Sequence, residues 1–235
     1  MDTAILPILL ALLIGVAHIW SDRVCIVCTI YGEQVISVVA GAATAYVFMN
    51  LYPEFYREAA ALNPWIFSSV FFGFVAFHLI DKEIYQKFRR GKVPKEIKEA
   101  HGYGLIIYYF VVGVTLAKLL NISFRNGILF FVPVLIYAAL STLSKHGIHG
   151  MHGPYYRVIS HLHFMQAIAV VVGSAIALII PIPEHVLIYS IGLVAGILTY
   201  VVVRDLLPKG RKGYPLYFII GAAIYLALIG LLWHI

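Results

Sequence analysis

The chain has 235 residues, of which 62% are hydrophobic and only 12% are charged, and its formal net charge is +6. A soluble domain of this length needs more polar surface to cover its core, so this composition excludes an ordinary soluble protein and predicts an all-α integral membrane protein in a lipid bilayer. In such a protein an excess of Lys and Arg first reports orientation, so no nucleic-acid partner is predicted.

Eight apolar segments are long enough to cross a bilayer, whose hydrocarbon core of about 30 Å requires about 20 residues of helix. The first segment follows Asp2 with no basic residue before it, so we interpret it as a retained span and not as a signal peptide. Together the segments predict one membrane domain over residues 1–235, with spans at about 4–20, 29–52, 64–84, 103–120, 126–143, 162–180, 184–203 and 215–234.

The basic residues predict how the spans are oriented. The connections after the first, third, fifth and seventh spans hold fourteen of the 17 Lys and Arg residues, and the other side holds only Arg57, Lys118 and Arg125. The positive-inside rule therefore predicts a multi-pass protein of the cell membrane with both termini outside. The segment 82–101 is the longest basic cytoplasmic connection, and anionic lipid headgroups are its expected partners.

Soft metal ligands gather on the side assigned to the cytoplasm. Cys25 and Cys28 have the spacing of a metal-binding or redox pair, and the segment 145–161 is a loop rich in His and Gly. We therefore expect a cytoplasmic site for zinc or another divalent cation and name no other cofactor. Its candidate ligands are Cys25, Cys28, His146, His149, His152, His161 and His163. The alternative is that these histidines place amphipathic rings at headgroup depth.

Two other functional classes have weaker support. His18, His78 and His163 lie near a common depth, which leaves haem ligation open. The sequence has no pattern of a Ser/His/Asp triad, a phosphate-binding Gly loop or a carboxylate pair in mid-membrane, so no enzymatic activity is predicted.

The second and seventh spans contain an internal repeat, at residues 41–53 and 196–208. In both segments Thr follows the first Gly by three residues, and a polar residue, Leu and Pro follow it by nine, ten and twelve. Because an even-numbered and an odd-numbered span cross the bilayer in opposite directions, the pattern predicts an inverted repeat that relates the N- and C-terminal three-helix units. The alternative is a coincidence between two apolar helices that end at a proline.

These two segments resemble helices of the ZIP family of divalent metal-ion transporters. The stretch from Ala40-Gly41 to Leu51-Tyr52-Pro53-Glu54 is similar to the family's "G…HLLPE" helix, with Asn50 where a His is common. The stretch from Ala195-Gly196 to Asp205-Leu206-Leu207-Pro208 is similar to its "AG…LYVA…DLLPE" helix. The resemblance implies eight spans, outside termini and inward movement of zinc, iron or manganese without nucleotide hydrolysis.

The fourth and fifth spans depart from the family's metal-binding motifs. Against its "HNxxDG" motif, Tyr108 stands at the His, Tyr109 at the Asn and Val112 at the Asp. Against its "HExPHE" motif, Tyr137 and Ser141 stand at the two His positions and Ala138 at the Glu. Phenol hydroxyls are poor substitutes for imidazole and carboxylate ligands, so the resemblance implies a degenerate metal site.

Hydroxyl groups remain in these two spans. They could join helices by hydrogen bonds, or they could line a polar pathway. Pro133 would also free a backbone carbonyl in the fifth span. The expected transport pathway consists of Asn50, Tyr108, Tyr109, Tyr137, Ser141 and Asp205.

The sequence thus predicts a ZIP-like membrane transporter, with a non-transporting membrane scaffold, subunit or cytoplasmic metal sensor as the alternative. A homodimer is left open.

Overall fold

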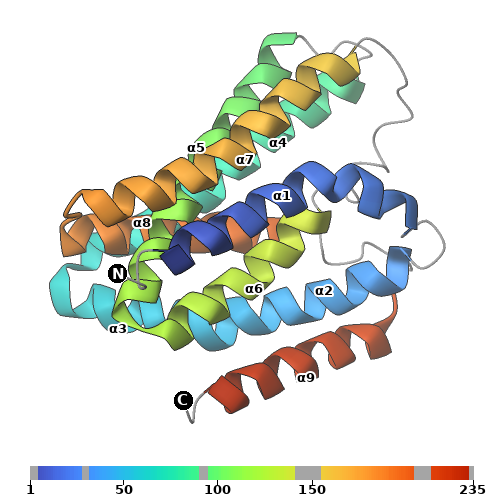
Figure 1. Ribbon diagram of the computed structural model, residues 1–235. Helices are drawn as coiled ribbons and strands as arrows, with labels where there is room; N and C mark the ends of the chain where they lie inside the picture. Colours follow the sequence, from blue (N-terminus) through green and yellow to red (C-terminus); the bar gives the residue numbers. More distant parts are fainter. Residues whose placement is uncertain (1–4, 28–31, 90–94, 141–154, 204–212, 233–235) are drawn as a thin grey trace.

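The computed structural model describes residues 5–27, 32–89, 95–140, 155–203 and 213–232, and the elements in these ranges are helical (Figure 1). They are α1 (Ile5–Val27), α2 (Gly32–Tyr46), the π-helical turn η1 (Val47–Leu51), α3 (Tyr52–Leu62), the 3₁₀ turn η2 (Pro64–Phe67), α4 (Ser68–Arg89), α5 (Lys95–Ile122), α6 (Phe124–Leu140), α7 (Tyr155–Ile179), α8 (Glu184–Val201) and α9 (Pro215–Leu232). The predicted all-α class is confirmed.

Five helical stretches in the described part are long and apolar enough to cross a membrane: Glu33–Ala60, Gly102–Ile122, Leu162–Ile179, Glu184–Val201 and Pro215–Leu232. Three shorter apolar stretches accompany them, at Ile5–Ser21, Pro64–Ile80 and Phe124–Ala139. Large apolar side chains such as Leu216, Ile224 and Leu231 are exposed on the outside of the bundle. An apolar exterior of this kind suits a lipid environment.

Some helix ends differ from the predicted bounds. The second span continues past Pro53 to Leu62, because a π-helical turn precedes the proline. In this wider turn the amide of Tyr52 bonds to the carbonyl of Val47, so the missing amide of Pro53 disturbs the helix little. At the other end of the bundle α4 extends to Arg89 and α5 begins at Lys95, so much of the predicted basic connection is helical.

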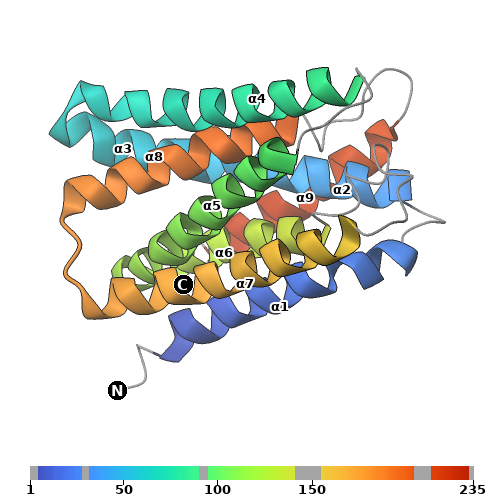
Figure 2. The same cartoon turned by 90° about the horizontal axis from the view of Figure 1, so that it is seen from above.

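The closest helix pairs join segments that are far apart in the sequence. α2 lies along α9, α4 along α8, α5 along α7, and α1 packs against α6 and α7 (Figures 1 and 2). In the pairs α2 with α9, α4 with α8 and α5 with α7, both helices run in the same direction (Figure 1). Glycines allow this close packing, because a side chain at Gly113 would overlap the backbone of α7, and one at Gly173 would overlap the backbone of α5.

The start of α1 and the end of α9 lie at the same end of the bundle as α3, at the left of Figure 1. The ends of α1, α4 and α6 lie at the opposite end. Along the described chain, the helices α1, α2 and α4 to α9 therefore run alternately in opposite directions.

Candidate functional site

The side chain of His18 lies inside the bundle, only 1% exposed, where α1 faces α5 and α7. Its Nε2 lies 2.7 Å from Oε1 of Gln166, and its Nδ1 lies 3.0 Å from the hydroxyl of Tyr109. The amide nitrogen of Gln166 donates to the carbonyl of Gly102 over 3.4 Å, which fixes the orientation of the amide. His18 Nε2 therefore carries the hydrogen and donates it to Gln166, while Nδ1 accepts from Tyr109. The network fixes the orientation of the His18 imidazole through both of its nitrogens.

A second imidazole adjoins this network. The ring of His163 on α7 lies 5.0 Å from that of His18, measured between centroids. Because Gln166 and Tyr109 engage both nitrogens of His18, neither nitrogen is available to a haem iron in this arrangement.

The described residues contain no group of three or more His, Cys, Asp or Glu side chains that could hold a metal ion. Cys28, His146, His149 and His152 lie outside the described residues, and for Cys25 and His161 only the backbone is described. The predicted metal site therefore remains a prediction.

Tyrosines fill the centre of the bundle. Tyr46, Tyr108 and Tyr225 are at most 2% exposed, and the ring of Tyr46 packs edge-on against Tyr225 with 5.8 Å between centroids. The hydroxyls of Tyr46 and Tyr108 have no hydrogen-bond partner within the described part of the chain. Buried polar atoms are usually paired, so these two hydroxyls make the central region a candidate functional site.

Two of the predicted pathway residues lie side by side in the core. Tyr108 and Tyr109 are adjacent in the core, with 5.3 Å between their ring centroids. Asn50 lies in η1 and Tyr137 on α6, and both are partly exposed. Ser141 and Asp205 lie outside the described residues.

A polar contact near the other end of the bundle links α3 to α6. The carboxylate of Glu54 accepts a hydrogen bond of 2.8 Å from Asn126 and one of 2.6 Å from Arg57. The Glu54 side chain is only 17% exposed, whereas that of Arg57 is 64% exposed. Glu54, Asn126 and Gln166 were not among the predicted site residues. The signal that could have identified them is a polar or charged side chain within or beside an apolar span.

The helices that carry the sequence repeat also share local structure. Thr44 donates to the carbonyl of Ala40 and Thr199 to that of Ala195, each over 2.7 Å. The sixth residue after each repeat glycine then begins a π-helical segment, at Val47 after α2 and at Val202 after α8. The hydroxyl of Tyr52 lies 3.0 Å from that of Thr199 and so bridges the two helices.

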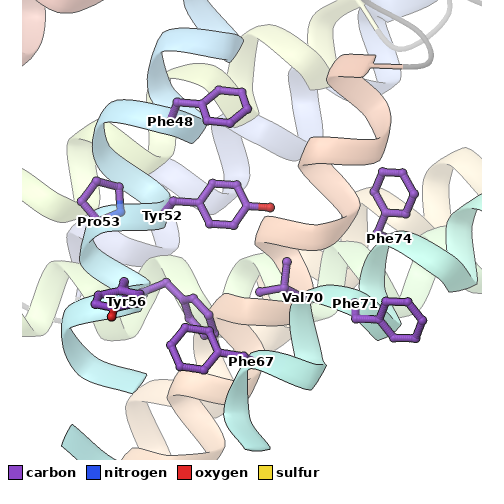
Figure 3. A pocket seen from close by; sticks show the side chains of 9 residues that line it. Phe48, Tyr52, Pro53, Tyr56, Phe67, Val70, Phe71 and Phe74 are labelled. Atoms are coloured by element: carbon purple, nitrogen blue, oxygen red, sulfur yellow. The ribbon is translucent and has the colours of Figure 1, made fainter. Parts of the chain in front are cut away.

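A groove of about 600 Å³ opens on one side of the bundle, between η1 and α3 on one wall and α4 on the other (Figure 3). Its lining is almost entirely aromatic, and Figure 3 shows the ring of Tyr52 crossing it toward α8. The lining residues are Phe48, Tyr52, Pro53, Phe55, Tyr56, Phe67, Val70, Phe71 and Phe74.

Comparison with known proteins does not name a family, since no family model matches the chain and no match is found among curated proteins.

Proposed function

We propose that the protein is a ZIP-like secondary transporter, built on an inverted repeat of its N- and C-terminal three-helix units. The proposal rests on the sequence resemblance and on one structural observation. In each of two helix pairs, the two helices contact each other through glycines at matching positions.

The first pair is α2 with α9, where a side chain on Gly41 would overlap the backbone of Phe218, and one on Gly221 would overlap Val38. The second pair is α8 with α4, where a side chain on Gly196 would overlap the backbone of Val70, and one on Gly73 would overlap Leu193. Gly41 and Gly196 are the matched positions of the sequence repeat, and in both helices the second contact lies three residues before that glycine.

The matching also covers the threonine hydrogen bonds and the π-helical segments. The matched glycines also make the same kind of backbone contact, Gly41 with α9 and Gly196 with α4, which supports the repeat. Inverted repeats of this kind underlie alternating access in secondary transporters. The orientation we propose is that of the positive-inside rule, with both termini outside.

The solute class we propose is a divalent cation, following the resemblance. The central groups include the hydroxyls of Tyr46 and Tyr108, which have no hydrogen-bond partner among the described residues. Neutral ligands bind zinc or iron more weakly than carboxylates and imidazoles in a complete ligand set. A passing cation would therefore keep part of its hydration shell and be held weakly.

The test is uptake of zinc, manganese and iron into proteoliposomes that contain the purified chain. We expect saturable uptake of at least one of these cations, reduced in Tyr108→Phe and unchanged in the control Tyr217→Phe. Tyr108 is buried and its hydroxyl has no partner in the part of the chain that the structure describes, whereas Tyr217 is 39% exposed. Uptake no greater than that of empty liposomes contradicts the transporter proposal.

The alternative is a membrane scaffold, subunit or metal sensor that does not transport. One observation favours it, namely that the described residues contain no three-ligand metal group. Tight zinc binding that requires the 145–161 segment, together with no uptake, is the result expected of a sensor.

A further inference from the structure

We propose that the aromatic groove of Figure 3 binds the hydrocarbon chain of a membrane lipid, and that it recognises the chain and not the headgroup. This inference requires only that the protein lies in a membrane. It goes beyond the transport proposal and stands if no solute is moved.

The groove lies at a depth in the bilayer where lipid hydrocarbon chains are found. Trp65 in η2 is 76% exposed, and exposed tryptophans of membrane proteins concentrate at the bilayer interface. Phe71 and Phe74 follow it along α4 by six and nine residues, which at a helical rise of 1.5 Å per residue places them about 9 and 14 Å deeper. Half of the hydrocarbon core is about 15 Å thick, so the groove lies within one leaflet.

The groove is open on the outside of the bundle, which faces the lipid. Phe48 is 56% exposed, and Tyr56 and Phe71 are each 64% exposed. At this depth the surrounding medium is hydrocarbon, so whatever enters from the side is apolar. A volume of about 600 Å³ also lies within the range of about 300–1,000 Å³ that is typical of small-molecule sites.

The hydroxyl of Tyr52, whose ring crosses the groove, is already engaged within the protein. The hydroxyl of Thr199 donates to the carbonyl of Ala195, so its oxygen accepts the hydrogen of Tyr52 across the 3.0 Å contact. Both hydroxyl hydrogens are therefore used within the protein. Apart from the exposed hydroxyl of Tyr56, the lining side chains thus present apolar groups, which suit a hydrocarbon chain.

The cation nearest to the groove in sequence, Arg57, is already paired. Arg57 is adjacent to Tyr56, but it pairs with Glu54 at 2.6 Å and with Glu58 at 3.2 Å. Two carboxylates thus already neutralise the cation nearest to the groove in sequence, and a lipid phosphate gains little there. Recognition of the lipid therefore depends on its hydrocarbon chain.

The experiment uses the full chain in vesicles that contain a phospholipid with a photoreactive diazirine in mid-chain, followed by irradiation and mapping of the labelled peptides. We expect groove residues to be labelled at least about fivefold more than Ile219 and Ile224 of α9, which are exposed to a similar extent. An unlabelled phospholipid should compete, and zwitterionic and anionic headgroups should give equal labelling.

Two matched pairs of variants sharpen the test. Val70→Phe fills the groove and should lower its labelling to the level of α9, whereas Ala76→Phe, at an exposed position of α4 outside the lining, should not. Phe71→Ala should change the labelling pattern more than Phe72→Ala, although the two side chains are 64% and 61% exposed. The label on α9 reports in every variant whether the bundle has folded.

Three results would overturn the inference. Uniform labelling of all exposed residues means that lipid contacts the groove only as it contacts the rest of the surface. Dependence on the headgroup means that the polar end is recognised. Crosslinks from groove residues to another protein molecule mean that a second copy of the chain covers this face.

Discussion

The hydroxyl of Tyr225 on α9 donates a hydrogen bond to the backbone carbonyl of Leu129 on α6, with 2.6 Å between the two oxygens. Leu129 lies four residues before Pro133, which has no amide hydrogen to complete the helical hydrogen bond. The side chain of another helix thus satisfies the carbonyl that the proline leaves free. This is the free carbonyl that the proline predicts, and the tertiary structure supplies its partner.

This relationship predicts a coupling between Tyr225 and Pro133. Tyr225→Phe leaves the Leu129 carbonyl without its partner and should cost about 1 kcal/mol of unfolding free energy, as interhelical hydrogen bonds in membranes typically do. In a Pro133→Ala background the new amide can bond to Leu129, so the same change should cost much less. A double-mutant cycle measured by unfolding in mixed detergent tests this. Equal costs in both backgrounds would show that the proline and the tyrosine act independently.

The His18 network predicts a difference between two histidines. His18→Ala leaves Tyr109 and Gln166 buried without their shared partner, which should cost about 1–3 kcal/mol. His78 is exposed, so His78→Ala should change the unfolding free energy by less than about 0.5 kcal/mol. Thermal unfolding in detergent gives both values. A similar loss in the two variants would argue against the network as a source of stability.

The glycine contacts predict which glycines tolerate a methyl group. Gly41→Ala and Gly196→Ala place Cβ against the backbone of α9 and α4, so each should cost about 1–3 kcal/mol by overpacking. Gly230 has no atom near its Cβ position, and Gly230→Ala should be neutral or stabilising by up to about 1 kcal/mol. The measurement is the free energy of unfolding of the three variants. A stable Gly41→Ala together with an unstable Gly230→Ala would contradict the helix packing.

The charge distribution predicts which end of the bundle faces the outside of the cell. With Cys25 and Cys28 replaced by Ser, Leu62→Cys and Gln86→Cys each provide one accessible thiol, at opposite ends. A membrane-impermeant maleimide added to intact cells should modify the first variant and not the second. Both should react after the membrane is opened, which serves as the control. The reverse pattern would invert the proposed topology.

Local composition was enough to predict the class of the fold and most of its spans. Apolar length and proline positions are local properties, and they place helices such as α8 and α9 within a few residues of their observed bounds. The end of the second span was missed because a proline normally disfavours helix, whereas here a π-helical turn before Pro53 lets the helix continue.

The expected site was predicted only in part. Tyr108 and Tyr109 were named for their hydroxyl groups, and both are buried in the core. Gln166 was overlooked, because one amide in an apolar span has no neighbours in the sequence that reveal its role. It becomes significant only where α1, α5 and α7 meet and bring it within 2.7 Å of His18.

By itself the sequence determined that this is a helical chain with apolar spans, a strongly uneven charge distribution and two matched segments. These features depend on residue type and spacing, which follow from the chemistry of the bilayer and the period of the helix. Only the tertiary structure decided that α2 pairs with α9 and α8 with α4, and that Gln166 and Tyr109 contact the two ring nitrogens of His18. Contacts between distant segments depend on which helices pack closely at their glycines. The same spacing of glycines in the sequence is compatible with many pairings of helices.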